Sequence, residues 1–133
     1  MMVDWNEYAR HYIDQLGGSE EESAYHRLID ADEAVVPVLI GAFRAQQDPG
    51  VRALLVEIVW QHRLPETVGF LIEALDDRDP GVWKSALDGL VTLGPLAIQA
   101  LRSARECILP TTVEERTRAE WIEEAIQQIQ EGT

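Results

Sequence analysis

The sequence lacks the features of a secreted or membrane-spanning protein. Its single cysteine, Cys107, leaves no possibility of a disulfide within the chain. The first residues, MMVDWNEYAR, carry charge early and lack the apolar core of a signal peptide. The longest apolar run, AVVPVLIGAF, contains a proline and a glycine and is shorter than the roughly 18 residues of a membrane span. We therefore expect a protein of a reducing, cytoplasmic compartment without membrane association.

Basic residues are also scarce. The 133-residue chain has 11 Lys and Arg against 24 Asp and Glu, a net charge of −13. The excess of acidic over basic residues is strongest in residues 1–33, which carry nine acids and two arginines. Nucleic-acid-binding proteins gather positive charge to displace counterions from phosphates, so no nucleic-acid ligand is expected. A basic protein partner would be attracted, although the same acidity also serves solubility alone.

Motifs of known chemistry are absent as well. The chain has no HExxH, no GxSxG, no glycine-rich phosphate loop and no cysteine–histidine cluster. The acidic segment DDRDPG does not have the spacing of a calcium loop. Counting from Asp77, the required glycine would fall on Val82, and counting from Asp76, the closing glutamate would fall on Leu87. We expect no catalytic residue, no metal site and no cofactor.

The sequence does contain a repeat. The tetrapeptide DPGV occurs at Asp48–Val51 and at Asp79–Val82, 31 residues apart. An apolar stripe with the spacing of one helix face comes after each copy, and a second such stripe precedes it. Aspartate caps a helix N-terminus and proline suits the first helical position. Each copy therefore predicts the start of a helix, and each unit is a helix, a short turn and a second helix.

Extending this period predicts one all-α domain, 1–133, without strands. Residues 1–32 are expected to form acidic capping helices, with Ser19 and Glu22 as a capping box, and residues 33–130 form the regular units. Polar end units suit an array whose ends have no neighbour to cover them. The predicted helices are 4–16, 20–30, 33–46, 50–62, 66–76, 81–93, 96–107 and 113–130.

The segments VVPVLIGAFRAQQDPGVRALLVEIV (35–59) and TVGFLIEALDDRDPGVWKSALDGLVTLG (67–94) resemble HEAT repeats, particularly the short bacterial variety. The family pattern has a proline in the first helix, an aspartate turn, and a second helix that begins with Val-Arg. In the second unit Gly69 replaces the proline and Trp83 replaces the arginine, and the third unit, from Pro95, lacks DPGV. The resemblance implies a short, right-handed, armadillo-like α-solenoid of about four antiparallel helical pairs, whose second helices line the concave side. It implies no activity.

Candidate partner-binding residues lie on that expected concave side. Trp83 is turned about 100° from Val82 of the apolar stripe, so we predict it as an exposed anchor, with packing against a neighbouring repeat as the alternative. Arg52 is expected either to bind a partner carboxylate or to pair with Asp48 or Asp79. The complete predicted set is Trp83, Arg52, Lys84, Asp88, Arg118 and Trp60.

These observations predict a non-enzymatic protein-binding or scaffold module that acts as a monomer and recognises a protein partner, basic in character. Two alternatives stay open. One is an acidic immunity or inhibitor protein that masks a basic toxin or enzyme. The other is a HEAT-like accessory lyase, or another enzyme, whose site has no recognisable motif.

The interpretation of DPGV as a helix start is testable at Asp79. Replacing it with alanine (Asp79→Ala) removes the predicted cap and should lower the free energy of unfolding by about 1 kcal/mol. Chemical denaturation of both proteins measures the difference. Calcium-dependent stabilisation of the wild type in the same experiment would contradict the assignment.

Overall fold

The computed structural model describes residues 2–132, and within that range the only regular secondary structure is helical. The α-helices are α1 (Trp5–Ile13), α2 (Glu21–Asp30), α3 (Val36–Ala45), α4 (Pro49–Gln61), α5 (Val68–Leu75), α6 (Pro80–Leu93), α7 (Pro95–Glu106) and α8 (Val113–Glu131). Two short 3-10 turns, η1 (Glu33–Val35) and η2 (Pro65–Thr67), lead into α3 and α5. The all-α prediction is confirmed, and the predicted helices differ from the observed ones mainly at their ends.

Both DPGV copies begin helices, as predicted. The Asp48 side chain accepts a hydrogen bond from the Gly50 N–H (3.4 Å) at the start of α4. At the start of α6, Asp79 accepts from Gly81 (2.8 Å) and Val82 (3.3 Å). The proline next to each aspartate takes the first helical position, where its missing N–H leaves no bond unmade.

The predicted capping box of the second helix is wrong. The N-cap of α2 is Glu20, whose side chain makes no capping bond. Glu21 instead accepts a hydrogen bond from the backbone N–H of Gly17 (2.9 Å). Gly17 has a φ of +87°, a value that glycine adopts without strain, so the chain turns there and Ser19 is displaced from the cap.

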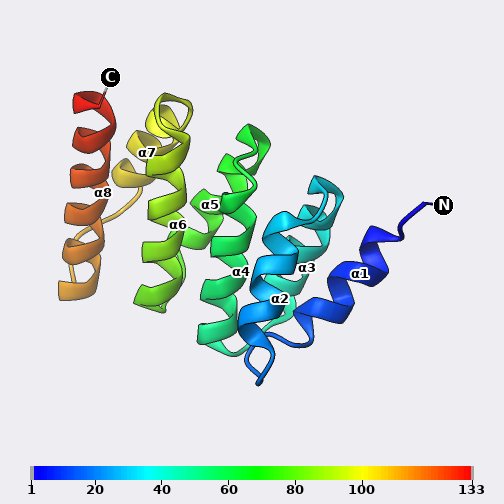
Figure 1. Cartoon of the computed structure of the whole chain (residues 1–133). Coiled ribbons are helices and arrows are strands. Elements are labelled where there is room, and N and C mark those ends of the chain that lie inside the picture. Colours follow the sequence, from blue (N-terminus) through cyan, green and yellow to red (C-terminus); the bar gives the residue numbers. More distant parts are fainter. Residues whose placement is uncertain (1, 133) are drawn as a thin grey trace.

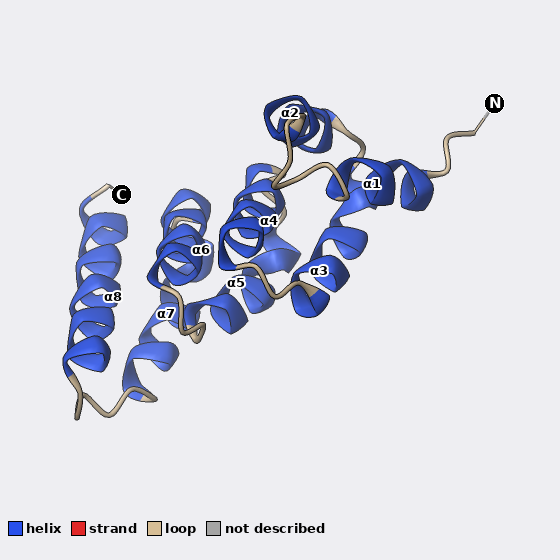
Figure 2. Cartoon of the chain, turned by 90° about the horizontal axis from the view of Figure 1, so that it is seen from below, coloured by secondary structure: helices blue, strands red, loops and turns tan. Residues whose placement is uncertain are grey.

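The helices form two rows. Each odd-numbered helix packs against the even-numbered helix that comes after it, and α2, α4, α6 and α8 also pack against one another in that order. In Figure 1 the helices α3, α5 and α7 lie behind the even-numbered helices, and in Figure 2, seen from below, they lie beside them. The most extensive packing joins α4 to α6. We call α2, α4, α6 and α8 the even row.

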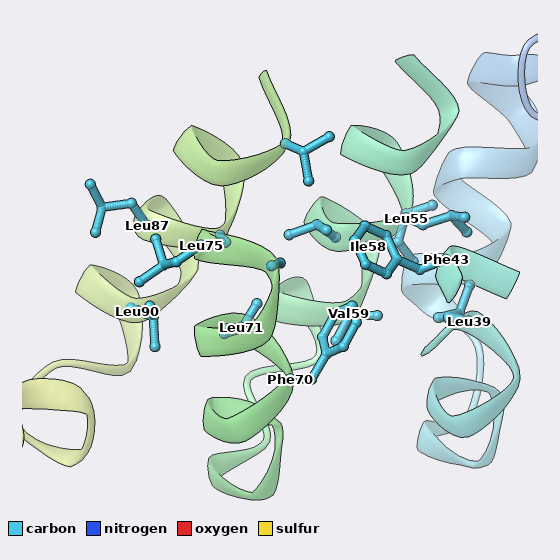
Figure 3. Packing of buried hydrophobic residues seen from close by; sticks show 14 of the residues in the cluster. Leu39, Phe43, Leu55, Ile58, Val59, Phe70, Leu71, Leu75, Leu87 and Leu90 are labelled. Atoms are coloured by element: carbon cyan, nitrogen blue, oxygen red, sulfur yellow. The ribbon is translucent and has the colours of Figure 1, made fainter. Parts of the chain in front are cut away.

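The hydrophobic core runs between the two rows. The predicted stripes supply it: Val51, Leu55, Ile58 and Val59 of α4 and Val82, Ala86, Gly89 and Leu90 of α6 are all buried. Figure 3 shows the packed side chains of α3 to α6. Phe43 of α3 and Phe70 of α5 meet edge to face, with ring centroids 5.2 Å apart, which joins the odd-numbered helices of consecutive pairs.

The close approach of α4 to α6 depends on a glycine. A Cβ atom placed on Gly89 would lie 2.6 Å from both Cβ and Cγ of Trp60. These are atoms at the base of the tryptophan side chain, which cannot move aside unless the helix moves. Gly89 therefore leaves the space in which Trp60 packs against α6.

Replacing Gly89 with alanine (Gly89→Ala) should lower the free energy of unfolding by about 1 to 3 kcal/mol, because the added methyl group overpacks the α4–α6 contact. A matched control is Gly41→Ala in the middle of α3, where an added Cβ meets no atom within 4 Å. The control should be stabilised by about 0.5 to 1 kcal/mol, since alanine favours a helix interior. Equal effects in thermal denaturation would contradict the steric role of Gly89.

Candidate functional site

Asp77 binds the turn between α5 and α6 to two other helices, α4 and α8. Its Oδ1 accepts a hydrogen bond from the Asp79 N–H (3.0 Å), and its Oδ2 pairs with Arg52 Nη2 of α4 (2.7 Å). Its carbonyl oxygen accepts a hydrogen bond from Arg118 Nη2 of α8 (2.7 Å). Only 9% of the Asp77 side chain is exposed, so these bonds form largely out of water. We call these contacts the Asp77 junction.

Both arginines of the junction also lie over aromatic rings. The Arg52 guanidinium carbon is 4.3 Å from the centroid of Phe43, and that of Arg118 is 5.6 Å from a ring centroid of Trp83. Their Nε atoms are buried and have no hydrogen-bond partner among the described residues. These guanidinium groups are engaged within the fold rather than offered to a partner. Arg52 does pair with an aspartate, but with Asp77 and not with Asp48 or Asp79.

Trp83 is not the exposed anchor that the sequence predicted. Only 4% of it is exposed, because α8 covers it. Its ring meets that of Trp121 edge to face, with centroids 5.8 Å apart. Trp121 is the exposed member of the pair, at 41%. The alternative noted for Trp83, packing against a neighbouring repeat, is the observed one.

Trp60 is half-buried against Gly89 and lies apart from the tryptophan pair. Its indole Nε1 is buried and finds no hydrogen-bond partner within residues 2–132. Its position two residues beyond Ile58 predicted a side chain off the main apolar stripe, and the structure directs that side chain into the α4–α6 contact. A direct contact between Trp60 and a partner stays a prediction.

Lys84 and Asp88 remain on the outer face of the even row. The Lys84 ammonium lies 4.7 Å from the centroid of Trp121 and 5.6 Å from that of Trp83. Asp88, one turn further along α6, is exposed and makes no ion pair among the described residues. Of the six predicted residues, Lys84 and Arg118 thus lie over the tryptophan pair that Trp83 forms with Trp121.

Two grooves lie side by side on this face and share Asp88. The first, between α4 and α6, is lined by Gly50, Ala53, Leu54, Glu57, Gly81, Lys84, Ser85 and Asp88. The second, between α6 and α8, is lined by Leu87, Asp88, Val91, Trp121, Glu124, Ala125 and Gln128. Each therefore has an apolar part and two carboxylates from facing helices.

The carboxylate of Asp88 is partly withdrawn from water, and this desolvation raises its pKa. Its ionised form is therefore less favourable in the folded protein than in the unfolded chain. At a pH above the pKa of Asp88 in both the folded and the unfolded chain, this lowers the stability of the fold. The loss disappears as the pH falls and the carboxylate becomes protonated. A cation brought into the groove would favour the ionised form and remove the same cost.

Sequence reasoning missed Asp77, Trp121, Glu57 and Glu124. One signal was present: Glu57 and Asp88 are 31 residues apart, the period of the repeat, and therefore occupy equivalent helix positions. Trp121 was missed because the overlay of the last helix on α4 gives it a core position. Overlaying RAEWIEEAIQ on RALLVEIVWQ places it on Leu55, which is fully buried. Within residues 2–132 the outer side of α8 has no neighbouring helix, so the equivalent position there stays open.

The described residues contain no group of three or more His, Cys, Asp and Glu side chains that could hold a metal ion. Among them, no helix has both the length and the apolar character needed to cross a membrane. Cys107, at the end of α7, is exposed. The chain gives no match to protein-family models, to curated proteins or to solved structures.

The Asp77 junction predicts a large difference between two adjacent aspartates. Replacing Asp77 with alanine (Asp77→Ala) leaves the Arg52 guanidinium without its partner and should lower the free energy of unfolding by about 2 to 3 kcal/mol. Asp76→Ala is the matched control. That side chain is 92% exposed and lies 3.6 Å from Arg118, so its loss should cost less than about 1 kcal/mol. Equal losses in urea denaturation would contradict the junction.

Proposed function

We propose that the eight helices form a short, right-handed, HEAT-like solenoid of four antiparallel pairs, with the even row on its concave side. Support comes from the packing order, in which each helix contacts its partner in the pair and the even-numbered helices contact one another in sequence. Further support comes from equivalent residues, since Arg52 of α4 and Arg118 of α8 both bind Asp77. The two arginines also overlay when the α4 and α8 sequences are aligned.

On this scaffold, we propose a non-enzymatic module that binds a basic protein partner across α4, α6 and α8. The observation that carries the proposal is the pair of adjoining grooves, whose carboxylates Glu57, Asp88 and Glu124 come from three consecutive helices of the even row. Arg52 and Arg118, on the same helices, are bound to Asp77 and do not neutralise these carboxylates. The face is therefore acidic, and it would attract and steer a basic surface.

The shape of the face favours a macromolecule over a small substrate. Small-molecule sites are concave, measure roughly 300 to 1,000 Å³ and bury most of their ligand, whereas the two grooves here, of about 190 and 290 Å³, are smaller and lie between neighbouring helices. A row of such grooves is suited to an extended or helical segment that crosses several helices. A basic toxin or enzyme masked by this face would be one member of the proposed partner class.

The test is affinity capture from host lysate with three baits. The front variant, Glu57→Gln/Asp88→Asn/Glu124→Gln, removes the acids of the grooves. The back variant, Glu33→Gln/Glu66→Gln/Glu106→Gln, makes the same change in net charge at exposed positions outside the even row. We expect wild type and back variant to retain a basic protein that the front variant loses, and capture should weaken as salt rises. Equal retention by all three baits would contradict the proposed face.

A further inference from the structure

The groove between α6 and α8 combines three chemical elements within about 190 Å³. Leu87, Val91 and Ala125 supply an apolar surface, and the carboxylates of Asp88 and Glu124 approach from opposite helices. Trp121, which is 41% exposed, adds an aromatic ring. The neighbouring groove between α4 and α6 is different, since Lys84 lies among its lining residues and opposes the charge of Glu57 and Asp88.

These elements match the parts of an arginine side chain. Its methylene stem can cover an apolar surface while its charged end reaches polar groups. Its planar guanidinium stacks on aromatic rings and offers five N–H donors, which suit two separate carboxylates. A lysine ammonium has the same charge, but it is more strongly hydrated and has no plane to lay against an indole.

The two carboxylates of the groove are free to pair with such a group. Neither Asp88 nor Glu124 makes an ion pair with the arginines and the lysine of the described residues. Lys84, one turn before Asp88 on α6, does not line this groove, but its ammonium lies 4.7 Å from the centroid of Trp121, so an incoming guanidinium would stack on the part of this 41% exposed ring that Lys84 leaves open. Partial burial raises the pKa of Asp88, as expected for a carboxylate that lacks its cation.

We propose that the α6–α8 groove is an arginine subsite, which holds one arginine side chain of a basic partner between Asp88, Glu124 and Trp121. This inference rests on the proposed function, because it places one residue of the partner on the same face. It goes further by naming the partner's side chain and by separating this groove from its neighbour.

The test uses three blocked nonapeptides of arginine, lysine or citrulline, titrated into the full chain at low salt and followed by calorimetry. Citrulline keeps the shape of arginine without its charge. We expect the arginine peptide to bind several-fold more tightly than the lysine peptide and the citrulline peptide not to bind. The variant Asp88→Asn/Glu124→Gln should weaken arginine-peptide binding about tenfold, since each exposed charge pair contributes up to a few-fold. It should also abolish the preference over lysine.

The variant Glu33→Gln/Glu66→Gln is the control for long-range attraction, because it makes the same change in net charge elsewhere on the chain. This control should change the affinity by less than about twofold at matched ionic strength. If both double variants lose the same affinity for the arginine peptide, the subsite is wrong, because the peptide would then respond only to the net charge of the protein. Equal affinity for the arginine and lysine peptides in the wild type would overturn it too.

Trp121 supplies an independent readout. The variant Trp121→Phe keeps an aromatic ring over Trp83 and should remain folded. Binding of the arginine peptide should change the tryptophan fluorescence of the wild type and leave that of Trp121→Phe nearly unchanged. A fluorescence change of the same size in both proteins would place the peptide elsewhere.

If the front variant still loses a lysate partner while these peptide results fail, the subsite is wrong and the binding face stands. If the lysate capture fails as well, both are wrong.

Discussion

The positions of α4, α6 and α8 depend on the bonds of one residue, Asp77. Asp77 sits in the turn between α5 and α6, yet its side chain binds α4 through Arg52 and its carbonyl oxygen binds α8 through Arg118. A charge with 9% exposure is stable only when its bonds are made. The relative positions of α4, α6 and α8 are therefore coupled, and with them the two grooves that separate these helices.

The same junction explains why the outer face is acidic in a protein that has arginines close by. Arg52 and Arg118 are held over aromatic rings and bound to Asp77. Their positive charges balance the negative charge of Asp77 in the turn. Within the described chain, Glu57, Asp88 and Glu124 form no ion pairs. The bonds that hold the turn in place therefore also keep the two arginines away from the carboxylates of the proposed binding surface.

Much of the fold could be predicted because its signals are local. The DPGV copies specify helix starts through short-range capping, and the stripes around Leu55 and Leu90 specify which face is buried. The site was harder because its contacts join residues far apart in the chain. The bond from Arg118 to Asp77 spans 41 residues. Which aspartate of DDRD pairs with Arg52 depends on how the turn is folded, and no local pattern states it.

The tryptophans illustrate the same limit. Helical phase turns Trp83 away from Val82, which predicted an exposed side chain, but Trp83 is buried in the core because α8 covers it. The overlay of α8 on α4 placed Trp121 at a core position, which α8 leaves open. Burial at such a position needs a neighbouring helical pair, and among residues 2–132 no pair lies against the outer side of α8 to cover Trp121.

Hydrogen–deuterium exchange of the full chain, with and without the arginine nonapeptide, shows whether the face organised around Asp77 receives the partner. Amides that the bound peptide shields or stabilises exchange more slowly, so the experiment locates the contact along the chain. We predict slower exchange confined to amides of α4, α6 and α8, strongest along the α6–α8 groove. Protection spread over α1, α3, α5 and α7, with none in the even row, would contradict a binding face on α4, α6 and α8.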